Sequence, residues 1–281
     1  MITAVRAGGA LPLKAAERLV RLPCAVSQLA EVRLRAGRRA AAIDLFGNIL
    51  PCSEVLSRSD IEECFQELCR HSVHSFSREI AEGYITLEGG HRAGFCGTAV
   101  MRGGQLDTLR EVSCINLRLA REVRGCAEEL HRAVFGGGLC SLLLAGAPMT
   151  GKTTLLRDLA RILGGRFRVS LIDTRGELAA VCRGTPALDV GENTDILDGY
   201  PRAQGIECAL RTLSPQVIIC DELGSDLDAV RQCCDSGVRL VAAVHAGSLE
   251  QLRRRRETSQ LLPLFDRVAV VGGLGEILEL E

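Results

Sequence analysis

Apolar runs alternate with helical stretches throughout the second half of the chain. The runs cover residues 138–146, 167–174, 215–222, 239–247 and 266–273, and each except the last is followed by a stretch of helical composition. Strands buried on both faces read as continuous apolar runs, and helices connect such strands when they are parallel. The pattern predicts an α/β domain in which helices cover both faces of a parallel sheet.

The first part of the chain mixes helical and strand signals. Helical patterns occupy residues 10–23 and 57–76, and the second has a cap signal at Ser59 or Asp60. Alternating patterns at 31–37, 41–50 and 83–100 predict strands, with a hairpin in the last segment. We therefore expect a smaller N-terminal α+β domain over residues 1–130 and the α/β domain over residues 131–281, with the boundary near the glycines of 125–138.

Composition indicates a globular protein with a sizeable core. Of the 281 residues, 47% are hydrophobic and 25% are charged, and the formal net charge is -1. Such a balance argues against bulk binding to nucleic acid or to a membrane surface. Arg6 and Lys14 interrupt any signal peptide, and no apolar stretch reaches the roughly 18–20 residues of a membrane span. The expectation is a soluble, cytoplasmic chain without a transmembrane segment.

The 13 cysteines do not have the spacing of a metal cluster or a redox motif. No pair forms a CxxC motif, and only Cys233 and Cys234 are adjacent. We expect free cysteines that pack as small hydrophobic residues. His71 and His74 are close together in the sequence, and we interpret them as part of a helix face or a loop rather than as ligands.

The segment GAPMTGKT, Gly146 to Thr153, matches the phosphate-binding pattern GxxxxGK[ST] between an apolar strand and a helix. Successive backbone N–H groups in such a loop point inward and bind phosphate oxygens at the N-terminus of a helix. Lys152 is expected to reach the β and γ phosphates, and the Thr153 hydroxyl to bind Mg²⁺. The predicted ligands are ATP and Mg²⁺, and the expected nucleotide-binding residues are Gly146, Ala147, Pro148, Met149, Thr150, Gly151, Lys152, Thr153 and Thr154.

Lysine usage supports this interpretation. The chain has only two lysines, Lys14 and Lys152, while arginine supplies every other basic side chain. A lysine is a compact point charge, whereas an arginine is a planar fork. Retention of a lysine within the loop therefore favours phosphate binding over a chance match.

Two carboxylates follow the apolar run 217–220. Asp221 is expected to hold the Mg²⁺ shell, and Glu222 to orient or deprotonate the attacking water. A buried strand that ends in a solvated acidic turn would give the same pattern. The phosphate-binding loop some 70 residues upstream favours the catalytic interpretation.

Polar residues also follow two other predicted strands. Asp173, Arg175 and Glu177 come after one strand, and His245 ends another. Ligands of open parallel sheets bind beyond the carboxyl ends of strands, so these residues could share one cleft. His245 could sense the γ phosphate or donate a hydrogen bond, and a packed core histidine is the alternative. For Glu177 the alternative is a carboxylate at a helix N-terminus.

The arginines are harder to assign. ATPases that assemble from such domains often use an arginine from a neighbouring subunit to stabilise the transferred charge. Arg118, Arg121, Arg175 and Arg211 are candidates for that role, and the sequence does not rank them. The run 253–256 is interpreted as a solvated helix face, with contact to a partner as the alternative.

Together these motifs resemble the stage III sporulation protein AA ATPases of endospore-forming Firmicutes. The similarity extends from about Glu31 onward and includes EVRLRAGR, GYITLEGGHRAGFCGTAV, INLRLAREVRG, GKTTLLRDLAR, DVGENTDILDGYPRAQG and LRTLSPQVIICDELG. The stretch GGHRAGFCG is informative because phosphate binding does not require it. The chain departs from the family at Asn193, where an arginine is usual, in the segment DTRGE, and at Leu223.

The resemblance implies a RecA-like ATPase domain similar to those of type II and type IV secretion ATPases. It also implies a homo-oligomer, with a hexameric ring as one form, and membrane proteins of a channel complex between mother cell and forespore as partners. The implied location is the mother-cell cytoplasm, at the outer forespore membrane. By the same resemblance, Glu177 matches an acidic box, Glu222 the Walker B glutamate and His245 a histidine box.

Two other functions are consistent with the same motifs. A nucleic-acid-dependent ATPase is one, because Arg70 and His74 have the spacing of a single-strand-binding module. Near-neutral charge and only 3% aromatic residues argue against stacking platforms and phosphate tracks. The other is an assembly scaffold that binds ATP and hydrolyses it very slowly.

Overall fold

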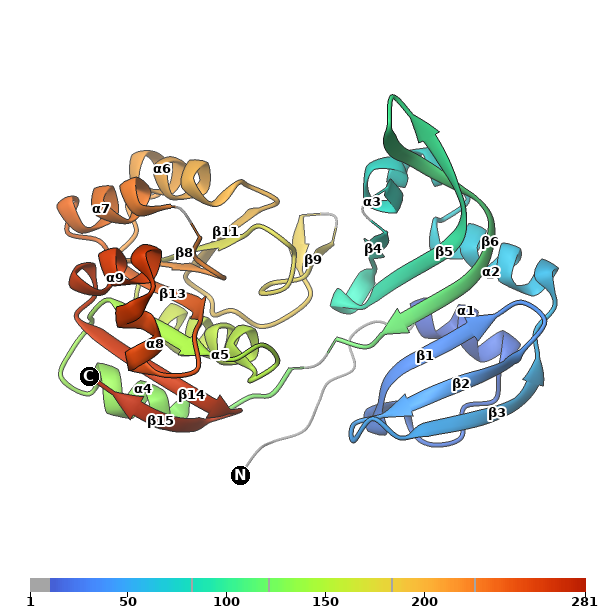
Figure 1. Ribbon diagram of the computed structural model, residues 1–281, viewed down its shortest axis with the longest axis horizontal. Coiled ribbons are helices and arrows are strands. Elements are labelled where there is room, and N and C mark those ends of the chain that lie inside the picture. The colour runs from blue at the N-terminus through green and yellow to red at the C-terminus, as the bar shows by residue number, and fades with distance from the viewer. Residues whose placement is uncertain (1–10, 82, 121, 183, 225) are drawn as a thin grey trace. The chain divides into compact units, whose positions relative to one another are not determined.

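The structure is a computed structural model that describes residues 11–81, 83–120, 122–182, 184–224 and 226–281. The chain divides into two compact units, which are treated separately below (Figure 1). Of the described residues, 122–181, 188–224 and 226–281 belong to one unit, and 11–81, 83–120, 182 and 184–187 belong to the other. The C-terminal unit thus begins at Glu122, before the glycines at which the sequence suggested a boundary.

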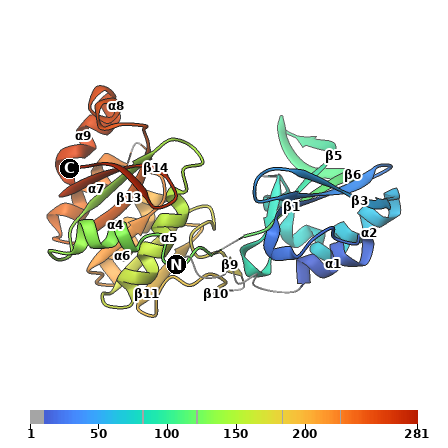
Figure 2. The ribbon, with the colours of Figure 1, turned by 90° about the horizontal axis from the view of Figure 1, so that it is seen from below.

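The N-terminal unit is a six-stranded sheet with helices packed on one face (Figure 2). Its strands run in the order β3-β2-β1-β6-β5-β4, and every neighbouring pair is antiparallel. Its elements are α1 (Leu11–Leu19), β1 (Leu29–Arg35), β2 (Arg39–Asp44), β3 (Ile49–Val55), α2 (Arg58–Leu68), α3 (Ser77–Ala81), β4 (Tyr84–Thr86), β5 (Arg92–Arg102) and β6 (Gln105–Arg118).

Helix α2 begins two or three residues earlier than the cap signals suggested. Ser57 is the N-cap, and its side chain accepts a hydrogen bond from the backbone N–H of Asp60. Asp60 in turn accepts from the N–H of Ser57, which completes a capping box. The buried side of the helix, which includes Ile61 and Phe65, packs in the core of the unit. His71 and His74 lie after this helix, in a turn and a short 3₁₀ segment.

The C-terminal unit has a seven-stranded sheet in the order β11-β8-β12-β13-β7-β14-β15. All neighbouring strands are parallel except β14 and β15. Its elements are α4 (Glu128–Phe135), β7 (Leu142–Gly146), α5 (Lys152–Gly164), β8 (Val169–Asp173), β9 (Val181–Cys182), β10 (Thr185–Pro186), β11 (Thr194–Asp198), α6 (Arg202–Thr212), β12 (Val217–Cys220), α7 (Leu227–Asp235), β13 (Arg239–His245), α8 (Leu249–Arg254), α9 (Arg256–Leu261), β14 (Arg267–Gly273) and β15 (Glu276–Leu280).

Helices cover both faces of this sheet, as the alternating apolar runs predicted. Leu142 and Leu144 of β7 pack with residues of α4 and α5, whereas Leu143 and Ala145 pack with residues of α6 and α7. Alternate side chains of one strand thus enter two separate cores, which explains why its sequence is apolar throughout. The fold class predicted from sequence, an α/β domain with a smaller N-terminal α+β domain, is confirmed.

One expected helix is absent, and several elements were not predicted. Residues 174–180 form a loop that precedes β9, although their composition suggested a helix. The elements without a prediction include β6, α4, β11, α6 and β15. All 13 cysteines lie within the described ranges and carry free thiols. No helix in those ranges is long and apolar enough to cross a membrane.

Candidate active site

The loop between β7 and α5 has a conformation that requires glycine. Gly151, the N-cap of α5, has φ 84° and ψ 17°, in the left-handed region, and Met149 has φ 65°. A Cβ atom on Gly146 would lie 2.5 Å from Oγ1 of Thr150. The two glycines of the predicted phosphate-binding pattern thus allow the turn and the close approach that the loop needs.

Lys152 is held at the base of this loop. Its Nζ atom lies 2.9 Å from the carbonyl oxygens of Gly146 and Ala147, and 3.0 Å from Nδ1 of His245. The residue is only 7% exposed. Burial lowers the pKa of Lys152, while the carboxylates that follow β12 act in the opposite direction. The lysine is positioned as a buried cation at the N-terminus of α5.

Strand β13 lies between β7 and β12, and this order brings three predicted site residues together. In the parallel register, His245 at the end of β13 pairs with Gly146 at the end of β7. The Nε2 atom of His245 lies 2.9 Å from Oε1 of Glu222, which follows β12. His245 therefore contacts Lys152 through one ring nitrogen and Glu222 through the other.

Glu222 has a second partner. An N–H group of Arg175 lies 3.8 Å from Oε2 of Glu222, while Oε1 faces His245. The carboxylate is thus contacted by a residue from the loop after β8 and by the last residue of β13. Arg175, one of four arginines considered for a role in a neighbouring subunit, lies beside the predicted catalytic glutamate of its own chain.

The side chains of Thr153 and Asp221 bring two oxygen atoms close together. Oγ1 of Thr153 lies 3.5 Å from Oδ2 of Asp221. Burial raises the pKa of Asp221, and the nearby carboxylates of Glu177, Asp173 and Glu222 add to this effect. Mg²⁺ prefers oxygen ligands, and a cation would relieve the repulsion among these carboxylates. The donor set fits Mg²⁺ held together with phosphate oxygens.

Asp173 orders the neighbouring loop instead of facing the cleft. Only 1% exposed, its carboxylate accepts hydrogen bonds from the backbone N–H groups of Glu177, Leu178 and Ala179. The guanidinium group of Arg157, on α5, donates to the carbonyl oxygens of Glu177 and Leu178. These bonds satisfy the backbone without a helix and fix the position of Glu177 relative to α5.

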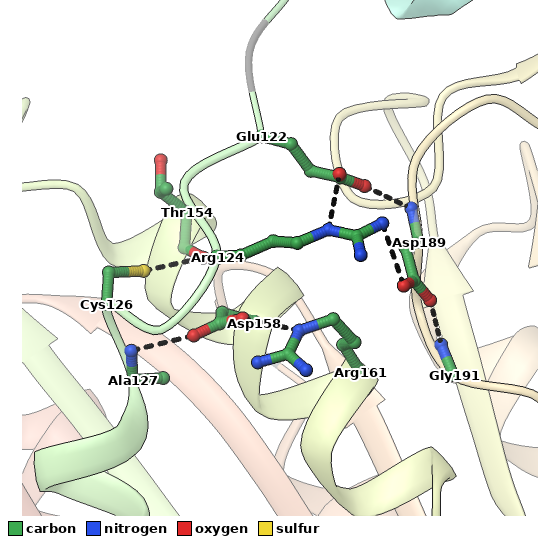
Figure 3. A network of polar contacts seen from close by, with 9 residues as sticks. All are labelled: Glu122, Arg124, Cys126, Ala127, Thr154, Asp158, Arg161, Asp189 and Gly191. Atoms are coloured by element: carbon green, nitrogen blue, oxygen red, sulfur yellow. Dashed lines mark hydrogen bonds and ion pairs between the residues drawn. The ribbon is translucent and has the colours of Figure 1, made fainter. Parts of the chain in front are cut away.

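The same helix is bonded to the first residues of the C-terminal unit (Figure 3). The buried carboxylate of Asp158 accepts from the backbone N–H of Ala127 at 2.9 Å. Glu122 accepts from Nε of Arg124 and from the backbone N–H of Asp189, while Arg124 also pairs with the Asp189 carboxylate. Sequence reasoning missed this network and the Arg157 contacts, because they join residues far apart in the chain.

Two of the remaining candidate arginines contact carboxylates other than Glu222. Arg118 lies 4.0 Å from Glu31 in the N-terminal unit, and Arg211 pairs with Glu207 on the surface of α6. Arg121 lies outside the described residues. These contacts do not identify an arginine that acts in a neighbouring subunit.

The arginine run after β13 is exposed, as a solvated face requires. Arg253 pairs with Glu281, and Arg254 pairs with Glu250 on the same helix. Arg255 donates to the carbonyl oxygen of His245 at 2.8 Å. One member of the run thus supports the strand end that carries the predicted histidine.

Asn193 has a structural role in this chain. Its side chain and its backbone N–H both donate to the carbonyl oxygen of Gly164, at the C-terminal end of α5. Helix ends leave carbonyl groups without partners inside the helix, and Asn193 satisfies one of them.

Across the described ranges, no group of three or more His, Cys, Asp or Glu side chains could by itself hold a metal ion.

Comparison with known proteins gives consistent results. Residues 11–279 match the family model described as sporulation stage III, protein AA. A "Stage III sporulation protein AA" of Bacillus subtilis is 33% identical over 250 residues, which cover 85% of this chain and 81% of that protein.

Solved structures share the fold at low sequence identity. The ATPase DotB of Legionella pneumophila superposes with a TM-score of 0.59 at 14% identity, covering 92% of this chain and 74% of that one. The pilus retraction motor PilT, solved with bound ADP, gives a TM-score of 0.55 at 16% identity, covering 92% of this chain and 76% of that one.

Proposed function

Because the chain belongs to the stage III sporulation protein AA family, we propose that it is a Mg²⁺-dependent ATPase that hydrolyses ATP to ADP and phosphate. The observation that carries the proposal is the line of contacts from Lys152 through His245 to Glu222. It joins a cation at the phosphate-binding loop to a carboxylate suited to act on water. The fold shared with DotB and PilT supports the same conclusion.

ATP would bind with its phosphates over the loop from Gly146 to Thr154. Backbone N–H groups of the loop and the N-terminus of α5 favour negative charge, and Lys152 neutralises the β and γ phosphates. Thr153 and Asp221 would hold Mg²⁺, which neutralises charge on the phosphate oxygens and orients them. The contact between their oxygen atoms supports this pairing.

Glu222 would act as the general base, accepting a proton from the attacking water as the new oxygen–phosphorus bond forms. His245 and Arg175, which contact its two carboxylate oxygens, would hold it in place. Glu177, which matches the acidic box by resemblance, would act as a further catalytic carboxylate. His245 would also report on the γ phosphate, because the same ring contacts the lysine that binds it.

We further infer that the ATPase works as a homo-oligomeric motor, with a hexameric ring as the favoured form. Its partners would be membrane proteins of a sporulation channel complex between mother cell and forespore, and it would act in the mother-cell cytoplasm at the outer forespore membrane. These inferences rest on the family and on the fold shared with secretion and pilus ATPases. Native mass measurement with and without ATP tests the ring directly.

Phosphate release by the wild type and by Glu222→Gln tests the enzymatic proposal. We expect Glu222→Gln to retain ATP binding and to lose about 10²–10⁴-fold in turnover, the range that general-base catalysis contributes. Equal, near-zero rates in the two proteins would support an ATP-binding scaffold instead. A severalfold, salt-dependent rise in turnover with single-stranded DNA or RNA would support a nucleic-acid motor.

A further inference from the structure

Two cysteines face each other across the long hairpin of the N-terminal unit. In the antiparallel pairing of β5 with β6, Cys96 is directly opposite Cys114, next to the pair Phe95 and Ile115. Phe95 and Ile115 are buried in the core. Because side chains alternate across a sheet, Cys96 and Cys114 share the opposite face. Cys96 is exposed and Cys114 is half-buried.

This arrangement satisfies the distance that a disulfide requires. Directly opposed residues of antiparallel strands have Cα atoms about 4.5 to 5.5 Å apart. Disulfides join residues whose Cα atoms are about 4.4 to 6.8 Å apart. The side chains are close enough for Cys96 to act as a hydrogen-bond partner of the Cys114 thiol. Two free thiols at directly opposed positions are therefore within the range of Cα separations that a disulfide spans.

The surroundings favour reaction at this pair over the core cysteines Cys64 and Cys69. Burial raises the pKa of the Cys114 thiol and the adjacent Cys96 adds to this, while Arg35, which pairs with Cys114 in the adjoining strand β1, and Arg33 act in the opposite direction. By contrast, Cys64 and Cys69 lie in the core, where burial raises their pKa values to about 12 and about 11. Thiolates are the reactive form, so the core cysteines are inert.

We propose that Cys96 and Cys114 form a redox-sensitive dithiol, which low-molecular-weight disulfides oxidise to an intramolecular cross-strand disulfide. The exposed thiolate of Cys96 attacks one sulfur of the small disulfide, forming a mixed disulfide and releasing the first small thiolate. Cys114 then loses its proton and attacks the Cys96 sulfur, which releases the second small thiolate. Two protein thiols are oxidised, one small disulfide is reduced to two thiols, and the two protein protons pass to these thiols or to solvent.

The crosslink would fix the register of the hairpin beside an irregularity. After Cys96 the register shifts, so that Thr98 pairs with Arg110. Gly97 sits at this shift, where a Cβ atom would lie 2.6 Å from the carbonyl oxygen of Arg110. A covalent bond next to such a bulge prevents the strands from slipping. The site lies in the N-terminal unit and is chemically independent of the proposed ATPase site.

Treatment of the native protein with oxidised glutathione, followed by alkylation, trypsin digestion and mass spectrometry, tests the proposal. Cleavage at arginine gives peptide 93–102, which contains Cys96, and peptide 111–118, which contains Cys114. We expect these two peptides joined and lighter by two hydrogen atoms than their sum, and separated again by dithiothreitol. Thiol titration under denaturing conditions should count 11 free thiols after oxidation instead of 13.

Single variants identify the order of attack. Cys114→Ser should accumulate one glutathione on Cys96, whereas Cys96→Ser should keep Cys114 largely as a thiol, and Cys64 and Cys69 should stay reduced throughout. Wild-type protein that stops at the mixed disulfide, that keeps both thiols, or that links either cysteine to another partner would overturn the proposal.

Discussion

The Nζ atom of Lys152 lies 3.0 Å from Nδ1 of His245, and this contact favours one tautomer of the imidazole ring. A lysine ammonium group can only donate hydrogen bonds, so Nδ1 must accept. The proton of the neutral ring is then on Nε2, which lies 2.9 Å from Oε1 of Glu222 and donates to it. With a charged lysine at Nδ1, the geometry favours the tautomer of His245 that carries its proton on Nε2.

Nitrogen NMR of the five histidines tests this assignment. At neutral pH, the His245 spectrum should have an unprotonated Nδ1 resonance and a protonated Nε2 resonance. The signals are identified by their absence from His245→Gln. In Lys152→Ala the ring proton should no longer favour Nε2 over Nδ1 as strongly, because the donor to Nδ1 is removed. A doubly protonated ring, or a proton on Nδ1 in the wild type, would contradict this assignment.

Close packing of α5 against the loop before β11 predicts a sensitive glycine. A Cβ atom on Gly164 would lie 2.8 Å from the backbone oxygen of Val190, so one of the two segments must move. We expect Gly164→Ala to reduce the free energy of unfolding by about 1–3 kcal/mol, as overpacking does. Chemical denaturation measures the effect.

Gly137→Ala is the matched control, because a Cβ atom there has no neighbour within 4 Å. That variant should change stability by about 1 kcal/mol or less. Equal effects of the two substitutions would show that the close packing at Gly164 has no energetic consequence.

The capping box of α2 predicts a pH-dependent contribution to stability. Hydrogen bonds from the backbone and side chain of Ser57 lower the pKa of Asp60 below its usual 3.8. Because the folded-state pKa is depressed, the stabilisation is present above pH 3.8 and is lost as the pH falls through the folded-state value. Asp60→Asn should therefore be less stable than the wild type at pH 7, by an amount that shrinks in acid.

Unfolding curves from pH 7 to pH 3 measure that difference. Ser57→Ala, which removes the other half of the box, should cost about 1 kcal/mol. A difference between Asp60→Asn and the wild type that grew as the pH fell would have the wrong sign for this account.

Local patterns indicated the candidate site residues. Asp221, Glu222 and His245 were indicated as polar residues at the ends of apolar runs, and Lys152 was indicated by the phosphate-binding pattern after another run. The parallel register brings these strand ends to one edge of the sheet. The loop 174–180 could not be predicted, because Asp173 and Arg157 satisfy its backbone through contacts of the folded chain.

Strand β11 and α6 were missed for a related reason. Their polar sequence has weak periodicity, and the strand is fixed by pairing with β8. The predicted cap of α2, Ser59 or Asp60, lies two or three residues after the observed cap Ser57, because each of these polar residues could begin the helix. Contacts between distant segments, such as Asp158 with Ala127, leave no local signal at all.

Calorimetric titration of ATP with Mg²⁺ into Lys152→Ala, compared with wild type and with Lys14→Ala, tests the central claim most directly. Hydrogen bonds to charged groups contribute about 1.5–3 kcal/mol, so the account predicts at least about tenfold weaker binding for Lys152→Ala. The variant that removes the other lysine should bind like the wild type. Equal ATP affinity in Lys152→Ala and wild type, with both proteins folded, would contradict the account.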